Sequence, residues 1–95
     1  NLDEGTVHLA EWLIDPGPGP ERMIEIQEMR RDVVRAIHTL PPDQRAAVVM
    51  FYYLEMSMKE MSGRTDRPLS TIKWWLRDAR KRLRNLLQIY ASEQE

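Results

Sequence analysis

The chain has 95 residues, of which 42% are apolar, and a formal net charge of −1, as expected for one small domain with a modest core. It contains no cysteine, which excludes a disulfide framework and a thiolate metal site, and His8 and His38 lie too far apart in sequence for a metal-binding pair. No apolar run approaches the roughly 20 residues of a membrane span, and no signal peptide follows Asn1, so we expect a cytoplasmic fragment of a longer protein without membrane insertion.

The first 20 residues have the composition of a tether. Residues 1–15 are acidic and carry a short apolar patch that can form a brief amphipathic helix; Trp12 in this patch is more often a packing residue than a binding anchor. The Pro-Gly-Pro-Gly-Pro run at 16–20 cannot form helix or central strand and predicts a linker. We therefore interpret residues 1–20 as an inter-domain linker or tether, whose helix either ends a preceding domain or docks on another surface.

We place the main domain at residues 21–95, with its first two helices at 21–40 and from 42 or 43 to about 55. Pro20 suits the first position of the earlier helix, and Pro41 ends that helix. Apolar residues recur in both helices at helical spacing and predict the core. They are Met23, Ile26, Val33, Ile37 and Leu40 in the first helix, and Val48, Phe51, Tyr52 and the neighbouring methionines in the second.

A short helix and a turn come next. Ser57 and Glu60 have the spacing of a capping box, which predicts a helix from Ser57 to about Arg64. Pro68 has no N–H and disfavours helix in the residue before it, so the chain must turn near residues 65–68. The segment 57–84 is therefore interpreted as a helix-turn-helix.

The second helix of this motif is predicted to begin with Ser70 or Thr71 as its cap and to end near Tyr90. At about 100° per residue its side chains separate into two faces. One face is apolar and consists of Ile72, Leu76, Ala79, Leu83, Leu86 and Tyr90. The opposite face is basic and consists of Lys73, Arg77, Arg80, Lys81 and Arg84. Five cations on one face repel each other unless an anion is present, and a row of phosphates is the obvious anion.

The charge of the chain is unevenly distributed. Residues 67–84 contain seven basic and one acidic side chain, whereas residues 1–66 contain seven basic and twelve acidic ones. An acidic body with one basic helix presents a single face to a polyanion. Taken alone, such a run of basic residues would be explained by the solvent-exposed face of an ordinary helix in a bundle. The position of this run on the second helix of a helix-turn-helix favours DNA instead.

Trp74 and Trp75 are adjacent, so they point about 100° apart on a helix and cannot share one role. Trp75 lies at the edge of the apolar face and is expected to pack. Trp74 lies on the polar side near Lys81, where its ring either covers the turn or contacts DNA or a protein partner.

No constellation of an enzyme is visible in the sequence. The two glycines of the linker lie among prolines and not in a phosphate-binding loop, and Ser57 and Ser62 have no histidine paired with them. We expect no catalytic activity, no cofactor and no metal site.

Four linked motifs run between Leu40 and Leu87 without a gap in their spacing. They are LPPDQR at 40–45, SMKEM at 57–61, PLSTIK at 68–73 and ARKRLR at 79–84. Together they resemble region four of the sigma-70 family, most closely that of the extracytoplasmic-function (ECF) sigma factors, where the pattern is roughly LPxxQR, LSxxEIA, PxGTVK and RARxxLR. The chain departs from that pattern at five positions: Ser62, Thr65, Ser70, Trp74 and Asp78. Trp74 stands where a small or polar residue is common, and Asp78 where Arg is common.

The resemblance implies a promoter-recognition domain without enzymatic activity. In the family this helix-turn-helix reads the −35 element of double-stranded promoter DNA, the domain binds the β flap of the RNA polymerase core, and anti-sigma factors commonly sequester it. On this interpretation Ser70, Thr71, Lys73, Trp74 and Arg77 reach base edges, because the N-terminal residues of such a helix enter the major groove. Phosphates are then held by Arg80, Lys81 and Arg84.

The sequence thus predicts an all-α fold: a linker segment followed by a small four-helix domain that ends in a helix-turn-helix. Two alternatives remain open. The first is the helix-turn-helix output domain of a response-regulator-type transcription factor, which binding to core polymerase would distinguish. The second is a protein-interaction helical bundle, which the salt dependence of DNA binding would distinguish.

Overall fold

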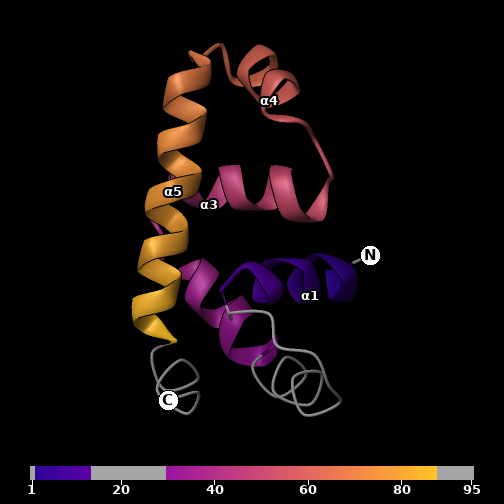
Figure 1. The fold of residues 1–95 in the computed structure, drawn as a ribbon, viewed down its shortest axis with the longest axis vertical. Helices are drawn as coiled ribbons and strands as arrows, with labels where there is room; N and C mark the ends of the chain where they lie inside the picture. The colour runs from indigo at the N-terminus through magenta and orange to yellow at the C-terminus, as the bar shows by residue number, and fades with distance from the viewer. Residues whose placement is uncertain (1, 14–29, 88–95) are drawn as a thin grey trace.

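The computed structural model describes residues 2–13 and 30–87, and every regular element within them is helical. The elements are α1 (Leu2–Leu13), a helix over residues 30–38, α3 (Pro42–Val48), the π-helical η1 (Val49–Tyr53), α4 (Met58–Thr65) and α5 (Leu69–Leu86) (Figure 1). The all-α prediction is confirmed. Several predictions fall outside the described residues: the linker at 16–20, the core positions Met23 and Ile26, Tyr90, and the side chain of Trp12.

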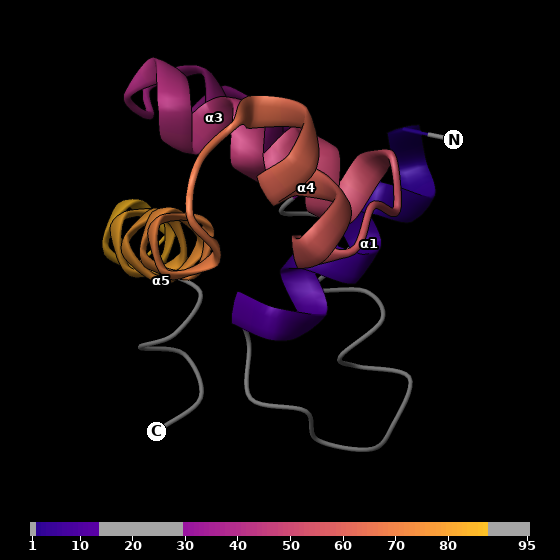
Figure 2. The ribbon, with the colours of Figure 1, turned by 90° about the horizontal axis from the view of Figure 1, so that it is seen from above.

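The long helix α5 forms one side of the molecule, and the other described helices lie along its length (Figure 1). Seen from above, α5 is viewed nearly end-on, with α3, α4 and α1 grouped beside it (Figure 2). One flank of α5 is therefore covered by the rest of the chain, while the other faces solvent. None of the described helices is long and apolar enough to cross a membrane.

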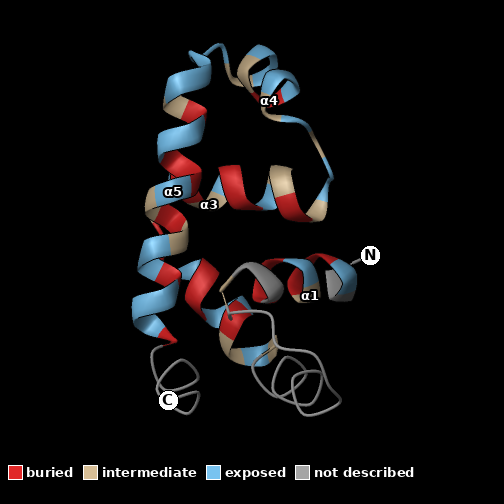
Figure 3. Ribbon diagram, in the orientation of Figure 1, coloured by how far each residue is buried: buried red, intermediate tan, exposed pale blue. Residues whose placement is uncertain are grey.

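The core forms along the covered flank of α5, as the red bands in Figure 3 show. Its fully buried side chains include those of Val33, Val48, Met61, Ile72, Leu76, Ala79 and Leu83. The predicted apolar face of this helix is thus confirmed through Leu83. Leu86 is a correction, because it is 55% exposed while Leu87 is buried. The helix ends at Leu86, and Leu87 is its C-cap, with its N–H bonded to the Leu83 carbonyl. At about 100° per residue, Leu86 and Leu87 lie about 60° and 40° to either side of the buried Leu83, and only the side of Leu87 is covered.

The start of α5 also differs from the prediction. Pro68 is the N-cap, with φ −59° and ψ 150°, and no side chain caps the helix. The Pro68 carbonyl oxygen accepts hydrogen bonds from the backbone N–H groups of Thr71, at 3.0 Å, and Ile72, at 3.2 Å. The helix therefore begins directly after the proline. Ser70 and Thr71, predicted as caps, lie inside its first turn.

The helix predicted from residue 42 to about 55 is present, but it changes type along its length. It is α-helical to Val48 and π-helical from Val49 to Tyr53, where the Leu54 N–H donates to the Val49 carbonyl over 3.0 Å. Wider π turns place more residues per turn than an α-helix does. The predicted core position is confirmed for Tyr52, which is buried. Phe51 is half-buried and packs against the core, with its ring edge-on to that of Tyr52 and the two ring centroids 5.0 Å apart.

The short N-terminal helix predicted in residues 1–15 is present as α1. It packs against the rest of the described chain. Leu9 and Ala10 are fully buried, and the Thr6 hydroxyl lies 2.8 Å from that of Tyr53. Gly5 allows the close approach, because a Cβ atom there would lie 2.5 Å from the Tyr53 ring. Burial in this contact raises the pKa of Tyr53 above its ordinary value, and the hydrogen bond to Thr6 opposes that rise.

Candidate nucleic-acid interface

The first helix of the motif, α4, begins with the predicted capping box. The Ser57 side-chain hydroxyl accepts from the Glu60 N–H at 3.0 Å, and the Glu60 carboxylate accepts from the Ser57 N–H at 3.2 Å. The reciprocal pair satisfies two backbone donors that a helix start otherwise leaves without partners. Met61 is fully buried and anchors this short helix in the core.

The turn between α4 and α5 is closed by side chains. Asp66 follows α4 in left-handed geometry, at φ 56° and ψ 39°, which Asp adopts more readily than most residues because its short side chain bonds locally. The Ser62 hydroxyl donates to the Arg67 carbonyl at 2.5 Å, and the Thr65 hydroxyl donates to the Met61 carbonyl at 2.8 Å. Ser62 and Thr65 are two departures from the sigma pattern. The Ser62 hydroxyl bonds across the turn, whereas the Thr65 hydroxyl bonds within the last turn of α4.

The solvent-facing flank of α5 carries most of the residues predicted to bind DNA. Ser70, Lys73, Trp74, Arg77, Lys81 and Arg84 are exposed, whereas Thr71 and Arg80 are half-buried. The Trp74 side chain is 57% exposed, an unusual position for so large an apolar group. An indole ring and a row of cations therefore share one continuous helix face, which we call the recognition face.

Arg80 lies at the border of the recognition face rather than on it. Its Nη1 donates a hydrogen bond of 3.1 Å to the hydroxyl of Tyr52 on η1. At about 100° per residue, Arg80 is closer to the buried stripe than Arg77 or Arg84 is. The expectation that all five cations stand fully in solvent is therefore corrected for Arg80, whose guanidinium also ties α5 to η1.

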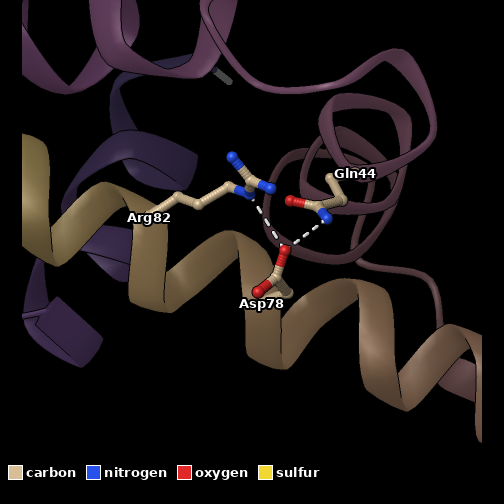
Figure 4. A network of polar contacts seen from close by, with 3 residues as sticks. All are labelled: Gln44, Asp78 and Arg82. Atoms are coloured by element: carbon tan, nitrogen blue, oxygen red, sulfur yellow. Dashed lines mark hydrogen bonds and ion pairs between the residues drawn. The ribbon is translucent and has the colours of Figure 1, made fainter.

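A polar network on the opposite border was not predicted as part of the site. Gln44 of α3 donates from Nε2 to Asp78 Oδ2 at 2.7 Å, and Arg82 donates from Nε to the same oxygen at 2.9 Å (Figure 4). The bonds from Arg82 and then from Gln44 lower the pKa of the Asp78 carboxyl below its ordinary value. The i, i+4 spacing of Asp78 and Arg82 indicated their pair in the sequence. Nothing in the sequence indicated the partner on α3.

The residues that the structure describes contain no group of three His, Cys, Asp or Glu side chains that could hold a metal ion. The recognition face offers hydrogen-bond donors and positive charge on one exposed side of α5. Such a surface matches base edges and phosphate oxygens, which are hydrogen-bond acceptors and anions.

Comparisons with known proteins agree with this geometry. The family model described as "Sigma-70, region 4" matches residues 30–83, which is more than half of the chain. The ECF RNA polymerase sigma factor RpoE of Cereibacter sphaeroides is 34% identical over 73 residues, covering 77% of this chain and 40% of that protein. The ECF RNA polymerase sigma factor SigE of Mycolicibacterium smegmatis is 30% identical over 76 residues, covering 80% of this chain and 30% of that protein. No solved structure gave a significant match.

Proposed function

Because this chain belongs to the sigma-70 region 4 family, we propose that it recognises the −35 element of promoters within an ECF-type sigma factor, and so directs RNA polymerase to start transcription. The recognition face of α5 is the observation that carries this proposal. It joins exposed cations to an exposed indole on the second helix of a helix-turn-helix, while the opposite flank of the same helix forms the core.

We propose a division of labour along α5. Residues near the N-terminus of a recognition helix reach base edges in the major groove, which assigns base contact to Ser70, Thr71, Lys73, Trp74 and Arg77. A Lys or Arg can donate to guanine O6 and N7, and an apolar ring can contact the methyl group of thymine. Arg80, Lys81 and Arg84 lie further along the helix and contact phosphates, which sets the register of the protein on the duplex.

The chain spans 40% and 30% of the two relatives named above, so the function of the whole protein also belongs to this proposal. Its partners would be promoter DNA, the β flap of the core polymerase, and an anti-sigma factor that covers the recognition face. We assign residues 21–95 to the DNA-binding domain and residues 1–20 to the tether, whose helix α1 packs on the domain. Its action on promoter DNA would take place in the cytoplasm.

The proposal is tested by selecting preferred duplexes from a random DNA pool with the 95-residue chain. Affinity is then measured on the selected duplex and on a shuffled one over a range of salt concentrations. We expect one enriched short motif, and a log–log salt slope of about −2 to −3 for two or three neutralised phosphates. An absence of both enrichment and salt dependence would favour the protein-interaction bundle.

A second measurement addresses the response-regulator alternative. The chain is presented to purified core RNA polymerase, and complex formation is followed by fluorescence anisotropy. A sigma region 4 domain is expected to bind the core without DNA. Sequence-selective DNA binding together with no affinity for core polymerase would support the alternative.

A further inference from the structure

We infer that Gln44, Asp78 and Arg82 form a positioning network that fixes the rotation of α5 on α3 and holds Arg82 away from the DNA. The inference rests on the proposed function, because it concerns how the recognition face meets a duplex. Asp78 is the centre of the network, since one of its oxygens accepts both hydrogen bonds (Figure 4).

The α3 end of the network is the buried amide of Gln44. Gln44 is only 3% exposed, and its Oε1 atom has no hydrogen-bond partner among the described residues. A buried acceptor without a partner costs stability, and an apolar side chain of similar volume would avoid that cost. What the amide provides is one directional bond to α5, of 2.7 Å from its Nε2 atom. Such a bond specifies orientation more than it stabilises the fold.

The α5 end of the network lies beside the recognition face. At about 100° per residue, Asp78 is displaced around the helix by about 40° from Trp74 and about 60° from Lys81. A rotation of α5 about its axis therefore turns these side chains through the same angle. Base-contacting groups must be held within about 10–20° of their working geometry. A bond from Asp78 to a buried partner on α3 supplies that restraint.

The third member of the network, Arg82, is a cation that the recognition face does not use. Its Nε donates to Asp78 at 2.9 Å, and its side chain is 54% exposed. It lies on the far side of Asp78 from Lys81, at the edge nearest α3. Removing the Asp78 charge would leave this long side chain able to reach a phosphate. Asp78 therefore limits non-specific affinity while it orients the helix.

Three substitutions separate the two roles, each measured on the preferred and on a shuffled duplex across salt concentrations. Gln44→Met removes the bond between the helices and leaves the Asp78–Arg82 pair, so the preference for the selected duplex should fall about fivefold or more with an unchanged salt slope. Asp78→Asn keeps an oxygen acceptor for Gln44 but loses the charge. Its preference should stay within about twofold of the original, while the salt slope steepens by about one. Asp78→Ala should show both changes. The conservative Asp78→Asn variant should thus keep the preference for the selected duplex that Asp78→Ala loses.

Asp43→Asn is the matched control, because it removes one carboxylate from an exposed position on α3 without touching the network. Gln44→Leu is a second variant should the methionine side chain disturb folding, which thermal melting reports. Unchanged preference in folded Gln44→Met or Gln44→Leu would overturn the orienting role. Equal salt slopes for Asp78→Asn and Asp43→Asn would overturn the restraint on Arg82. A wild-type chain without any sequence preference would overturn the proposed function, and this inference with it.

Discussion

Trp74 and Trp75 are neighbours in the chain, yet they lie on opposite sides of the boundary between core and solvent. Trp74 is 57% exposed on the recognition face, and Trp75 is 8% exposed against the core. They point about 100° apart on α5, and the edge of the buried flank falls between them, because Leu76 beside Trp75 is buried and Lys73 beside Trp74 is exposed. The register predicted for this helix is therefore confirmed at the place where an error would change every assignment of a DNA-facing residue.

The tryptophan pair gives the first prediction. Trp75→Ala should lower the free energy of unfolding by about 3–5 kcal/mol, because the truncation leaves a cavity in the core. Trp74→Ala should leave the melting temperature nearly unchanged and weaken binding to the selected duplex or to an anti-sigma factor. Thermal melts and anisotropy titrations of both variants measure the difference. The opposite pattern would mean that α5 is docked with another face toward the core.

Arg77 is expected to read sequence. It is exposed on the recognition face and lies in the N-terminal half of α5. Arg77→Ala should cost about 1–3 kcal/mol on the preferred duplex and relax the preference at one base pair. Affinities for a set of single-base variants of that duplex provide the measurement. An equal loss on every sequence would assign Arg77 to a phosphate instead.

Lys81 is expected to contact a phosphate, because it lies further along the exposed flank of α5 than Arg77 does. Lys81→Ala should weaken binding to preferred and shuffled duplexes alike, and should reduce the salt slope by about one. Lys59→Ala is the control, since Lys59 is an exposed lysine on α4 and its loss changes the net charge equally. If the two variants had the same slope, Lys81 would be only a solvated charge.

Replacement of glycine by alanine is expected to have opposite effects on stability at Gly63 and at Gly5. Ala is favoured over Gly inside a helix by about 1 kcal/mol. Gly63→Ala should therefore raise stability, because beyond the neighbouring residues and backbone of α4 itself, nothing lies within 4 Å of the added Cβ. The same change at Gly5 places the Cβ 2.5 Å from the Tyr53 ring and should displace α1. Chemical denaturation compares the two. Equal stabilisation by both changes would contradict the docking of α1.

The docking of α1 should also appear in the titration of Tyr53. Its folded pKa is raised above 10.0, chiefly by burial, so the neutral form is favoured in the folded chain. That contribution to stability is fully present below the ordinary tyrosine pKa and is lost as the pH rises through the folded value. In Gly5→Ala the pKa of Tyr53 should fall back toward 10.0. Absorbance of tyrosinate against pH follows this change, with Gly63→Ala as the unaffected control.

Asp78 should titrate in the opposite sense. Its pKa is lowered below 3.8, first by the bond from Arg82 and then by that from Gln44. The associated stability is present above the ordinary carboxyl pKa and is lost as the pH falls through the lowered folded value. Arg82→Ala should raise the pKa of Asp78 more than Gln44→Met does. Carbon NMR of the carboxyl group during an acid titration measures both shifts, and an unshifted Asp78 in the wild type would show that the network does not form in solution.

The sequence by itself determined the helices and the recognition face. Helical periodicity, the capping-box spacing at Ser57 and Glu60, and the break at Pro68 each depend only on residues close together in the sequence. They can therefore be predicted from the sequence alone. The same periodicity separated Trp74 from Trp75. These features fix which residues share a face of α5 before any other helix is placed.

Only the tertiary structure decided where the borders of that face lie and what holds it in place. The bonds from Arg80 to Tyr52 and from Gln44 to Asp78 join residues 28 and 34 positions apart, so no local pattern could indicate them. The contact between α1 and Tyr53 likewise depends on the packing of side chains that are far apart in the sequence. Leu86 and Leu87 lie at the two edges of the apolar stripe of α5, and only the packing of the other helices decides that Leu87 is buried and Leu86 exposed.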